Sequence, residues 1–236
     1  MQLEMSIAEN IERLNEQISQ AARAASRNPA EIELMAVSKV HPAEAIIEAY
    51  EAGHRLFGEN KVQEFQSKRE QLPALEGAHF HLIGPLQSNK TSKAAELFDA
   101  IDAVDALKIA QRLDATATTL NKSLPILIEV KLSHEDSKHG IAPEELPALL
   151  DAIAPLQFVH VTGLMTVPPW SEDAETARPY FRELRRLRDE AQKQHPTVTQ
   201  LSMGMTNDFA VAIEEGSTQV RIGTAIFGKR LYPPKA

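Results

Sequence analysis

A lysine at the end of a short apolar run is the clearest candidate for chemistry in this chain. The run covers residues 33–39, and its alternation places Lys39 on the same side as Met35 and Val37. A lysine is seldom left on an apolar face without a role. Desolvation lowers the pKa of an amine, and a partly deprotonated amine is what Schiff base formation with an aldehyde requires. The alternative is a lysine that extends to solvent and pairs with a carboxylate such as Glu59.

Two short loops near the C-terminus carry glycines and small hydroxyl residues, a composition suited to binding phosphate. They cover residues 202–206 and 221–225, and each follows an apolar run. Glycine lets backbone N–H groups approach an anion, and hydroxyl groups add further donors. The phosphate-binding candidates in these loops are Ser202, Gly204, Gly223 and Thr224. The alternative is that the glycines form turns and the hydroxyls cap helices.

Three other patterns indicate other chemistry only weakly. Residues 84–91 nearly match a nucleotide-binding loop, but Asn89 replaces the second glycine and Pro85 removes an N–H donor. The sequence His-Phe-His at residues 79–81 does not resemble the H-E-x-x-H motif, and the next histidines, His134 and His139, are far away in the chain. The arginines of residues 178–188 are interleaved with acidic residues, which is typical of a solvated helix face. We therefore expect no metal site and no NTPase.

The elements that must position these residues alternate between short apolar runs and helical stretches from residue 32 onward. The expected strands are residues 33–39, 55–58, 79–84, 100–104, 125–130, 158–165, 199–203 and 219–223. The expected helices are residues 42–52, 60–70, 88–98, 106–120, 143–153, 173–193 and 207–215. This order predicts an α/β fold, a (β/α)₈ TIM barrel whose function gathers where the strands end. An open doubly wound sheet is the alternative, but residues 40–44 contain no glycine for its nucleotide fingerprint.

An extra helix precedes the predicted barrel. Apolar residues spaced by three and four positions between residues 5 and 26 form one narrow stripe, and Asn28 and Pro29 end it. A coiled-coil seam is the alternative, but the stripe covers under three heptads. We expect one domain over residues 1–236, with residues 1–30 as an N-terminal helix docked on the barrel.

The composition excludes several classes of protein. The chain has 236 residues, of which 43% are hydrophobic, and its 25 basic and 33 acidic residues give a net charge of −8. That charge repels phosphate backbones, so nucleic acid is not an expected partner. The absence of cysteine excludes disulfides, a thiolate nucleophile and Cys-ligated metals. With no run of about 18 apolar residues and no apolar signal segment, we expect a cytoplasmic protein without a membrane span.

Seven segments together resemble the pyridoxal phosphate homeostasis protein family. They are residues 36–42, 57–60, 81–90, 133–140, 163–165, 201–205 and 220–228. Their order and spacing run through most of the chain, so the resemblance is far more specific than any one motif. It implies a barrel akin to the N-terminal domain of alanine racemase.

The resemblance also implies a cofactor, pyridoxal 5′-phosphate (PLP), and the residues that bind it. These residues are Lys39, Asn60, Met165, Ser202, Met203, Arg221, Gly223 and Thr224. Lys39 would hold the cofactor as an internal aldimine, and Arg221 would face the pyridine nitrogen. The phosphate would lie against Ser202, Gly223 and Thr224. The remaining three residues would line the ring.

The implied function is PLP homeostasis or delivery with little or no turnover. Arg221 stays protonated, so beside a ring nitrogen it disfavours ring protonation and weakens the cofactor as an electron sink. A racemase needs an acid and a base on opposite faces of the α-carbon. In the racemases the second group is a tyrosine from a separate domain, whereas here eight residues follow Gly228 and Tyr232 is their only tyrosine. Delivery would proceed by transimination, in which a free amine or the lysine of a PLP-dependent apoenzyme displaces Lys39.

Two enzymatic alternatives stay open. One is a slow PLP-dependent amino-acid racemase or another PLP enzyme. The other is a phosphate-sugar enzyme that uses Lys39 as an aldolase-type Schiff base donor. A monomer is expected, because the racemases build their dimer site through the second domain.

The chain departs from the family pattern at three places. Lys61 follows Asn60 where the family often has tyrosine. Thr206 replaces a serine and keeps its hydroxyl, whereas Asn207 replaces an acidic residue and removes a negative charge near the phosphate loop. Lys138 matches a basic family position and is either an accessory lysine for capture or release, or a surface charge.

Overall fold

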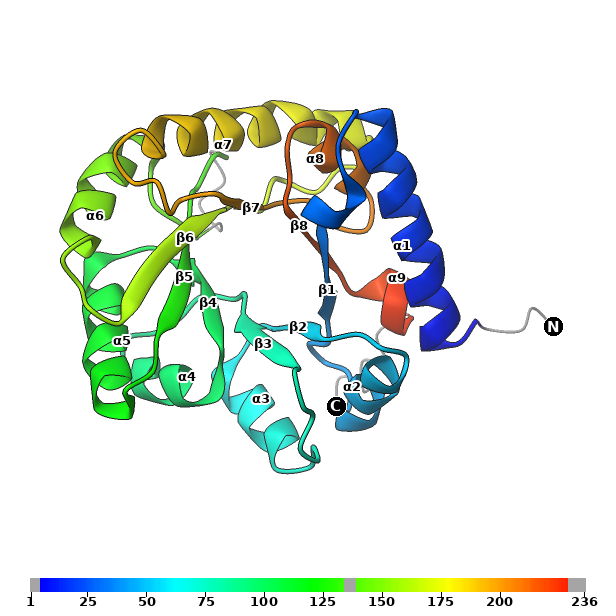
Figure 1. Cartoon of the computed structure of the whole chain (residues 1–236), viewed down its shortest axis with the longest axis horizontal. Helices are drawn as coiled ribbons and strands as arrows, with labels where there is room; N and C mark the ends of the chain where they lie inside the picture. Colours follow the sequence, from blue (N-terminus) through cyan, green and yellow to red (C-terminus); the bar gives the residue numbers. More distant parts are fainter. Residues whose placement is uncertain (1–4, 134–138, 229–236) are drawn as a thin grey trace, which may run out of the picture.

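The structure is a computed structural model, and it describes residues 5–133 and 139–228. Within these residues eight parallel strands form a closed barrel, seen along its axis in Figure 1. The strands are β1 (Glu33–Val37), β2 (Leu56–Glu59), β3 (His79–Leu82), β4 (Ala100–Val104), β5 (Leu124–Glu129), β6 (Val159–Met165), β7 (Gln200–Ser202) and β8 (Gln219–Ile222). Each strand pairs with its neighbours in sequence, and β8 closes the barrel on β1. The predicted TIM barrel is confirmed.

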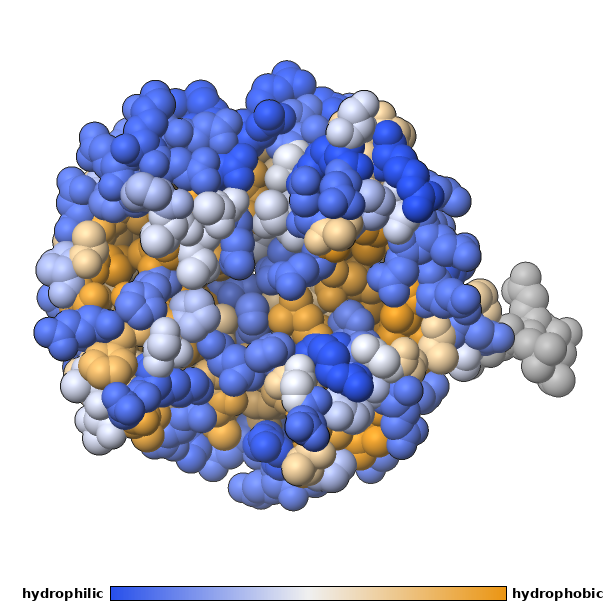
Figure 2. Space-filling model, viewed as in Figure 1, coloured by the Kyte–Doolittle hydropathy of each residue, from blue (hydrophilic) through white to orange (hydrophobic). Residues whose placement is uncertain are grey.

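Helices cover the outside of the barrel (Figure 1). The α-helices are α1 (Ile7–Ala24), α2 (Ala43–Glu51), α3 (Val62–Arg69), α4 (Thr91–Leu97), α5 (Leu107–Leu120), α6 (Leu146–Ile153), α7 (Arg178–Ala191), α8 (Phe209–Glu214) and α9 (Thr224–Phe227). Three short 3₁₀ helices are η1 (Pro29–Glu31), η2 (Pro143–Glu145) and η3 (Ala174–Ala177). Hydrophilic side chains gather over the outer helix α7 (Figure 2). No helix in the described part of the chain is long and apolar enough to cross a membrane.

Two elements near the ends of the strands differ from the predicted ones. β1 ends at Val37, so Lys39 lies in the turn that follows the strand and not in the strand itself. The helix α9, which begins directly after the glycine of the last strand end, was not predicted. A helix of four residues is too short to give a periodic apolar pattern, so the sequence showed only a loop there.

Aromatic side chains fill the space between the barrel wall and the helices α3 and α4. Phe57 on β2 stacks on Phe80 of β3 with ring centroids 5.3 Å apart. Phe65 of α3 lies 4.8 Å from the rings of both Phe80 and Phe98. These rings are almost fully buried, and such aromatic pairs add stability beyond the area that they bury. They fix α3 against the barrel. This position of α3 is important for the site because its residue Lys68 contacts the turn that follows β1.

The helix α1 packs on the barrel beside the last helices of the chain. It begins at a capping box in which Ser6 and Glu9 each bind the backbone of the other. Its buried side chains are Ile11, Leu14, Ile18 and Ala22, and it contacts α2, α8 and α9. Asn10 donates from Nδ2 to the carbonyl oxygen of Ile226, 3.1 Å away. The N-terminal helix therefore supports α9 from outside.

Candidate functional site

A cavity of about 730 Å³ opens where the strands end, which is the functional end of this fold. Its volume lies within the range of about 300–1,000 Å³ that is typical of small-molecule sites. The structure brings five of the predicted residues to its wall, namely Lys39, Asn60, Arg221, Gly223 and Thr224. They come from the ends of three strands, β1, β2 and β8, and from the start of α9. The wall therefore combines one amine, one guanidinium group and one glycine loop.

The turn after β1 presents Lys39 to this cavity. The Ser38 N–H donates to the carbonyl oxygen of Gly58 at 3.0 Å, and the His41 N–H donates to the carbonyl oxygen of Ser38 at 3.0 Å. Between them, Lys39 is partly buried on the cavity wall. Val40 has a φ of 60° and is half-exposed, an uncommon conformation for a β-branched residue. The alternation that predicted the direction of Lys39 is consistent with Val37, which lines the same cavity.

A buried group of charged side chains lies against this turn, and no pattern in the sequence predicts it. Nζ of Lys68 lies 2.7 Å from Oε1 of Glu59, 2.8 Å from Oε1 of Glu64 and 2.9 Å from the carbonyl oxygen of Ser38. The Ser38 hydroxyl also donates to Oε1 of Glu59 at 2.7 Å. We refer to Lys68, Glu59, Glu64 and Ser38 as the Lys68 cluster. Glu59 is the carboxylate considered above as a partner for Lys39, and here it accepts from Ser38 and Lys68.

The two carboxyl groups of the Lys68 cluster differ in their electrostatics. Burial raises the pKa of Glu59, although Lys68 and Ser38 act in the opposite direction. Burial also acts to raise the pKa of Glu64, but the hydrogen bonds from Lys68 and Val40 outweigh it and lower that pKa. The second oxygen of Glu59, Oε2, is buried and has no hydrogen-bond partner in the described structure. Glu59 is thus held by one of its two oxygens.

Arg221 forms the buried part of the cavity wall. One terminal nitrogen donates to the Ser202 hydroxyl oxygen at 2.7 Å, and the other donates to the carbonyl oxygen of Thr166 at 2.8 Å. Burial lowers the pKa of the guanidinium group, and the carboxylates of Asp102, Glu129 and Asp208 act against this shift. An arginine remains protonated in such surroundings. Arg221 therefore supplies a fixed positive charge at the cavity.

Three of the predicted residues lie beneath the cavity wall. Ser202 is fully buried, and its hydroxyl donates to Oε1 of Gln219 at 2.7 Å while it accepts from Arg221. Met165 and Met203 are also fully buried among core residues. Ser202 therefore orients Arg221, and contact between these three side chains and a ligand stays a prediction.

Thr206 is a wall residue that the analysis of the loops did not select. It lines the cavity beside Gly223 and Thr224, whereas Ser202 does not. The chain reverses between them at Gly204, whose φ is 98° and whose position leaves no room for a Cβ atom. Gly204 could have indicated this from the sequence. When the chain reverses at a glycine after a strand, the residue beyond the glycine lies at the rim of the cavity. The wall residues Thr206, Gly223 and Thr224 bring hydroxyl and backbone donors together.

The connection between β6 and α7 forms another side of the cavity, where Trp170 lines the opening and is 75% exposed. Asn207 donates from Nδ2 to the carbonyl oxygens of Ser171 and Glu172, at 2.9 Å and 3.2 Å. A carboxylate at this position has no N–H group to donate, so the asparagine fits these contacts. Asn207 thereby fastens the Trp170 connection to the loop that carries Thr206.

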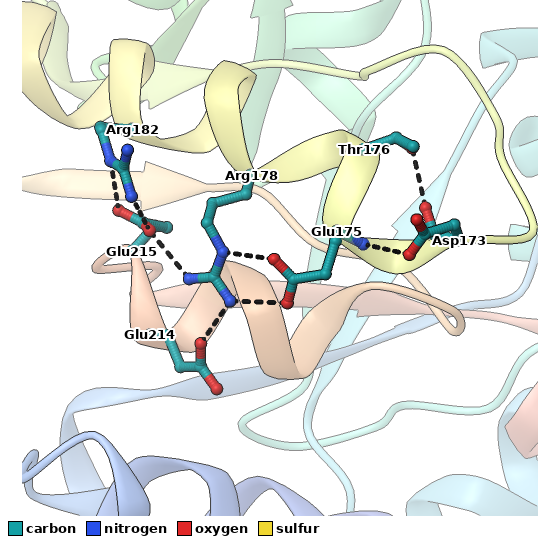
Figure 3. A network of polar contacts seen from close by, with 7 residues as sticks. All are labelled: Asp173, Glu175, Thr176, Arg178, Arg182, Glu214 and Glu215. Carbon is teal, nitrogen blue, oxygen red and sulfur yellow. Dashed lines mark hydrogen bonds and ion pairs between the residues drawn. The ribbon is translucent and has the colours of Figure 1, made fainter.

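A second group of charges joins the same connection to α8 (Figure 3). Arg178 binds Glu175 through two nitrogens and also reaches Glu214 and Glu215. Arg182 donates to Oε1 of Glu215 at 3.0 Å. We refer to these five residues as the Arg178 cluster. The predicted solvated face of the arginine-rich helix agrees with this arrangement, since most of these side chains are exposed.

The other end of the barrel holds a smaller cavity of about 300 Å³, lined by His79, His81 and Asp102 among others. Nδ1 of His81 lies 3.1 Å from Oδ1 of Asp102. Although burial lowers it, the Asp102 carboxylate raises the pKa of His81 above its ordinary value. In residues 5–133 and 139–228 no group of three or more His, Cys, Asp or Glu side chains could hold a metal ion. Lys138 and Tyr232 lie outside the described residues.

Sequence comparison identifies a protein family and several proteins that are similar to this chain. The family model described as "Alanine racemase, N-terminal domain" matches residues 9–231. The pyridoxal phosphate homeostasis protein of Vibrio alginolyticus is 44% identical over 231 residues, which cover 96% of this chain and 99% of that protein. The protein of the same name from Pseudomonas aeruginosa is 45% identical over 227 residues, covering 96% of this chain and 97% of that protein.

Solved structures show the same likeness. PipY from Synechococcus elongatus PCC7942, determined with PLP bound, is 41% identical and superposes with a TM-score of 0.84 over 94% of this chain and 100% of that chain. Its structure without PLP superposes with a TM-score of 0.86. Alanine racemase from Clostridium difficile 630 superposes with a TM-score of 0.70 at 15% identity, over 94% of this chain and 56% of that chain. The last likeness concerns the fold alone.

Proposed function

This chain belongs to the pyridoxal phosphate homeostasis proteins within the alanine racemase N-terminal domain family, and on that premise we propose that it binds PLP in the cavity at the strand ends. The amine of Lys39 holds the cofactor through a Schiff base. The protein acts in the homeostasis or delivery of PLP, with little or no catalytic turnover.

One observation carries this proposal: Lys39, Arg221 and the Gly223 loop line a single cavity. PLP has three groups that need such partners, an aldehyde, a ring nitrogen and a phosphate. An amine, a fixed guanidinium group and a rim of backbone and hydroxyl donors match them in number and in chemistry. At Gly223 a Cβ atom would lie 3.1 Å from the carbonyl oxygen of Val37, so the absence of a side chain keeps the rim open. The residues present fit the cofactor.

When bound, PLP supplies a reactive aldehyde and an electron-accepting ring. The nitrogen of Lys39 forms a bond to the aldehyde carbon, and the carbonyl oxygen leaves as water. Ser202, Gly223 and Thr224 would hold the phosphate together with Thr206 at the rim. Asn60, Met165 and Met203 would line the ring. Arg221 keeps the ring nitrogen unprotonated, because two cations beside each other repel. The ring then withdraws few electrons, which favours holding the cofactor over carbanion chemistry.

The tyrosine that the racemases use has no counterpart among the described residues of the cavity wall. The tyrosines in the described part of the chain are Tyr50 and Tyr180, and neither lines the cavity. Tyr50 instead donates to the carbonyl oxygen of Glu76 at the surface. A racemase needs a second acid or base across the substrate from the lysine, and tyrosine does not supply it from these residues.

Transfer to apoenzymes follows from the same chemistry. A free amine, or the lysine of an apoenzyme, would attack the carbon that Lys39 holds. The incoming nitrogen forms the new C=N bond and gives up two protons, and Lys39 takes up two protons and leaves as a free amine. The cavity opening beside Trp170 gives such an amine a route to Lys39. Direct transfer, a monomeric state and a cytoplasmic location stay predictions.

A binding experiment tests the proposal. Purified protein is mixed with PLP or with pyridoxal, which lacks the phosphate, then desalted and reduced with borohydride. We expect one equivalent of PLP to give a visible absorbance band. Reduction should replace this band by a near-ultraviolet band that stays with the protein, and pyridoxal should bind at least about 100-fold more weakly. A protein that stays colourless, or that binds both compounds equally, contradicts the proposal.

The racemase alternative needs a separate measurement. The PLP-loaded protein is incubated in deuterated water with several L-amino acids, and deuterium at the α-carbon is followed by NMR. We expect no exchange above that of free PLP. Exchange that exceeds this background and disappears in Lys39→Ala identifies an enzyme.

A further inference from the structure

We propose that Lys68, Glu59 and Glu64 are positioning residues that fix the backbone on both sides of Lys39 and so aim its amine at the cofactor. The inference rests on the proposed function, because it assigns these residues a part in the reaction of Lys39. None of the three lines the cavity. They act through the turn and not on the cofactor.

All three N–H donors of the Lys68 ammonium group have an acceptor in this turn or in the carboxylates that contact it. A lysine ammonium group has three N–H donors. Lys68 has three acceptors within 2.9 Å, the carbonyl oxygen of Ser38, Oε1 of Glu59 and Oε1 of Glu64. The side chain is only 8% exposed and that of Glu59 is fully buried. Water therefore has little access to replace these bonds, so the amine holds one geometry.

The contacts of the cluster bracket Lys39 in the chain. On the N-terminal side, Ser38 is bound twice, at its carbonyl oxygen by Lys68 and at its hydroxyl by Glu59. On the C-terminal side, the Val40 N–H donates to Oε1 of Glu64 at 2.5 Å. The same oxygen of Glu64 lies against Lys68. One ammonium group thus links the restraints that precede and follow Lys39.

The conformation of Val40 indicates that these restraints hold the turn against a local preference. A β-branched residue with a φ of 60° is a genuine outlier, and such residues persist only where the surroundings determine them. Val40 is 51% exposed, so packing of its side chain does not explain the conformation. The backbone bond from His41 to Ser38 closes the turn, and the hydrogen bond from the Val40 N–H to Glu64 restrains Val40 within it.

Stability alone does not explain why charged residues are buried in the Lys68 cluster. Two carboxylates and one amine lose hydration when they are buried, and apolar residues of similar volume often stabilise a protein equally well. What apolar residues lack is the ability to bind the N–H and the carbonyl groups of a turn. The directional contacts to Ser38 and Val40 are therefore the feature that needs the charged side chains.

The test compares two Glu64 variants, one without and one with a hydrogen-bond acceptor at the end of the side chain. Glu64→Leu removes the acceptor of Val40 and Lys68, whereas Glu64→Gln keeps an oxygen in that place. Lys68→Met removes the amine and keeps most of the apolar stem. Lys93→Met is the matched control. Lys93 lies on α4, where it forms an exposed ion pair with Glu96 of the same helix. Circular dichroism selects the variants that fold.

Two probes separate positioning from general damage to the cavity. PLP reports on the reaction of Lys39, through the rate of appearance of the visible band. The analogue 4-deoxypyridoxine 5′-phosphate keeps the ring and phosphate but has no aldehyde, so its affinity reports on the cavity alone. We expect Glu64→Leu and Lys68→Met to slow the reaction with PLP by about 10- to 100-fold. The affinity for the analogue should change less than threefold, and Glu64→Gln and Lys93→Met should behave as the wild type.

A measurement on the protein without cofactor completes the test. Hydrogen exchange of the Val40 amide, followed by NMR, should be slow in the wild type and in Glu64→Gln, and at least tenfold faster in Glu64→Leu. If the wild type reacts with PLP and the Glu64→Leu variant reacts at the same rate, the inference is wrong and the proposed function stands. Equal losses for PLP and the analogue also overturn the inference. If the wild type itself forms no visible band, the proposed function fails instead.

Discussion

Two charged clusters hold two of the loops around the cavity, and they differ mainly in exposure. The Lys68 cluster lies under the turn after β1, where Lys68 and Glu59 are almost completely buried. The Arg178 cluster holds the connection before α7 to α8, and the side chain of Arg182 is 67% exposed (Figure 3). Distances within the two clusters are alike, with most contacts between 2.6 and 3.0 Å.

Ion pairs of similar geometry can contribute different free energies. A buried charge that loses its partner keeps the full cost of desolvation, whereas an exposed one is solvated by water. The Lys68 cluster should therefore fix its turn rigidly, next to Lys39, the lysine that we propose to hold PLP. The Arg178 cluster should hold its loop weakly, beside the exposed Trp170 where a large partner would have to approach.

The largest expected effect comes from removing the buried amine. Lys68→Met leaves the carboxylates of Glu59 and Glu64 and the carbonyl of Ser38 without their common donor. We expect the free energy of unfolding to fall by about 3–5 kcal/mol, as measured by urea denaturation at pH 7. A loss below about 1 kcal/mol would mean that burial does not distinguish the two clusters.

An effect of intermediate size should appear in the pH dependence of the buried cluster. The pKa of Glu64 lies below its ordinary value of 4.5, because the bonds from Lys68 and Val40 outweigh burial. A lowered pKa adds stability that is present above pH 4.5 and is lost as the pH falls through the folded-state pKa. We expect Glu64→Leu to be less stable than the wild type by about 2 kcal/mol at pH 7, with a smaller difference below pH 4.

The measurement is urea denaturation of the wild type and Glu64→Leu at several pH values. Their difference reports on Glu64 and on its effect on Glu59, whose pKa the charge of Glu64 helps to raise. A difference that stays constant between pH 7 and pH 3 would refute this assignment.

The smallest effect should come from the exposed cluster. Arg178→Gln removes the bonds to Glu175 and Glu214, which are exposed, and the bond to Glu215, which is only 10% exposed but keeps Arg182 as a partner. We expect a loss below about 1 kcal/mol in low salt that disappears in 1 M salt, where the Debye length is about 3 Å. The loss in Lys68→Met should be nearly independent of salt. Equal salt dependence for the two variants would show that the clusters are energetically alike.

The sequence predicted the barrel well because buried parallel strands form apolar runs of recognisable length. All eight strands lie within two residues of their predicted bounds. The prediction was less successful where short-range geometry decides the structure. The turn at Ser38 and the four-residue helix α9 depend on a few hydrogen bonds, and no period in the sequence reports them.

In the site, too, some residues could be predicted from the sequence pattern and others only from the folded structure. Residues at strand ends, such as Lys39 and Arg221, could be placed on one cavity from alternation and order alone. Lys68 could not, because its spacing on α3 is that of any solvated lysine and only the packed structure reveals its burial. Thr206 was not selected for a related reason: the reversal at Gly204 leaves its hydroxyl at the rim, whereas Ser202 lies below the wall and its contact with a ligand stays a prediction.

The most direct test of the whole account identifies the lysine that carries the cofactor in the wild-type protein. Protein loaded with one equivalent of PLP is reduced with borohydride, which fixes the cofactor on the nitrogen that holds it, then digested and sequenced by mass spectrometry. The account predicts the modification on Lys39. Modification mainly on another lysine, such as Lys68 or Lys131, would contradict it.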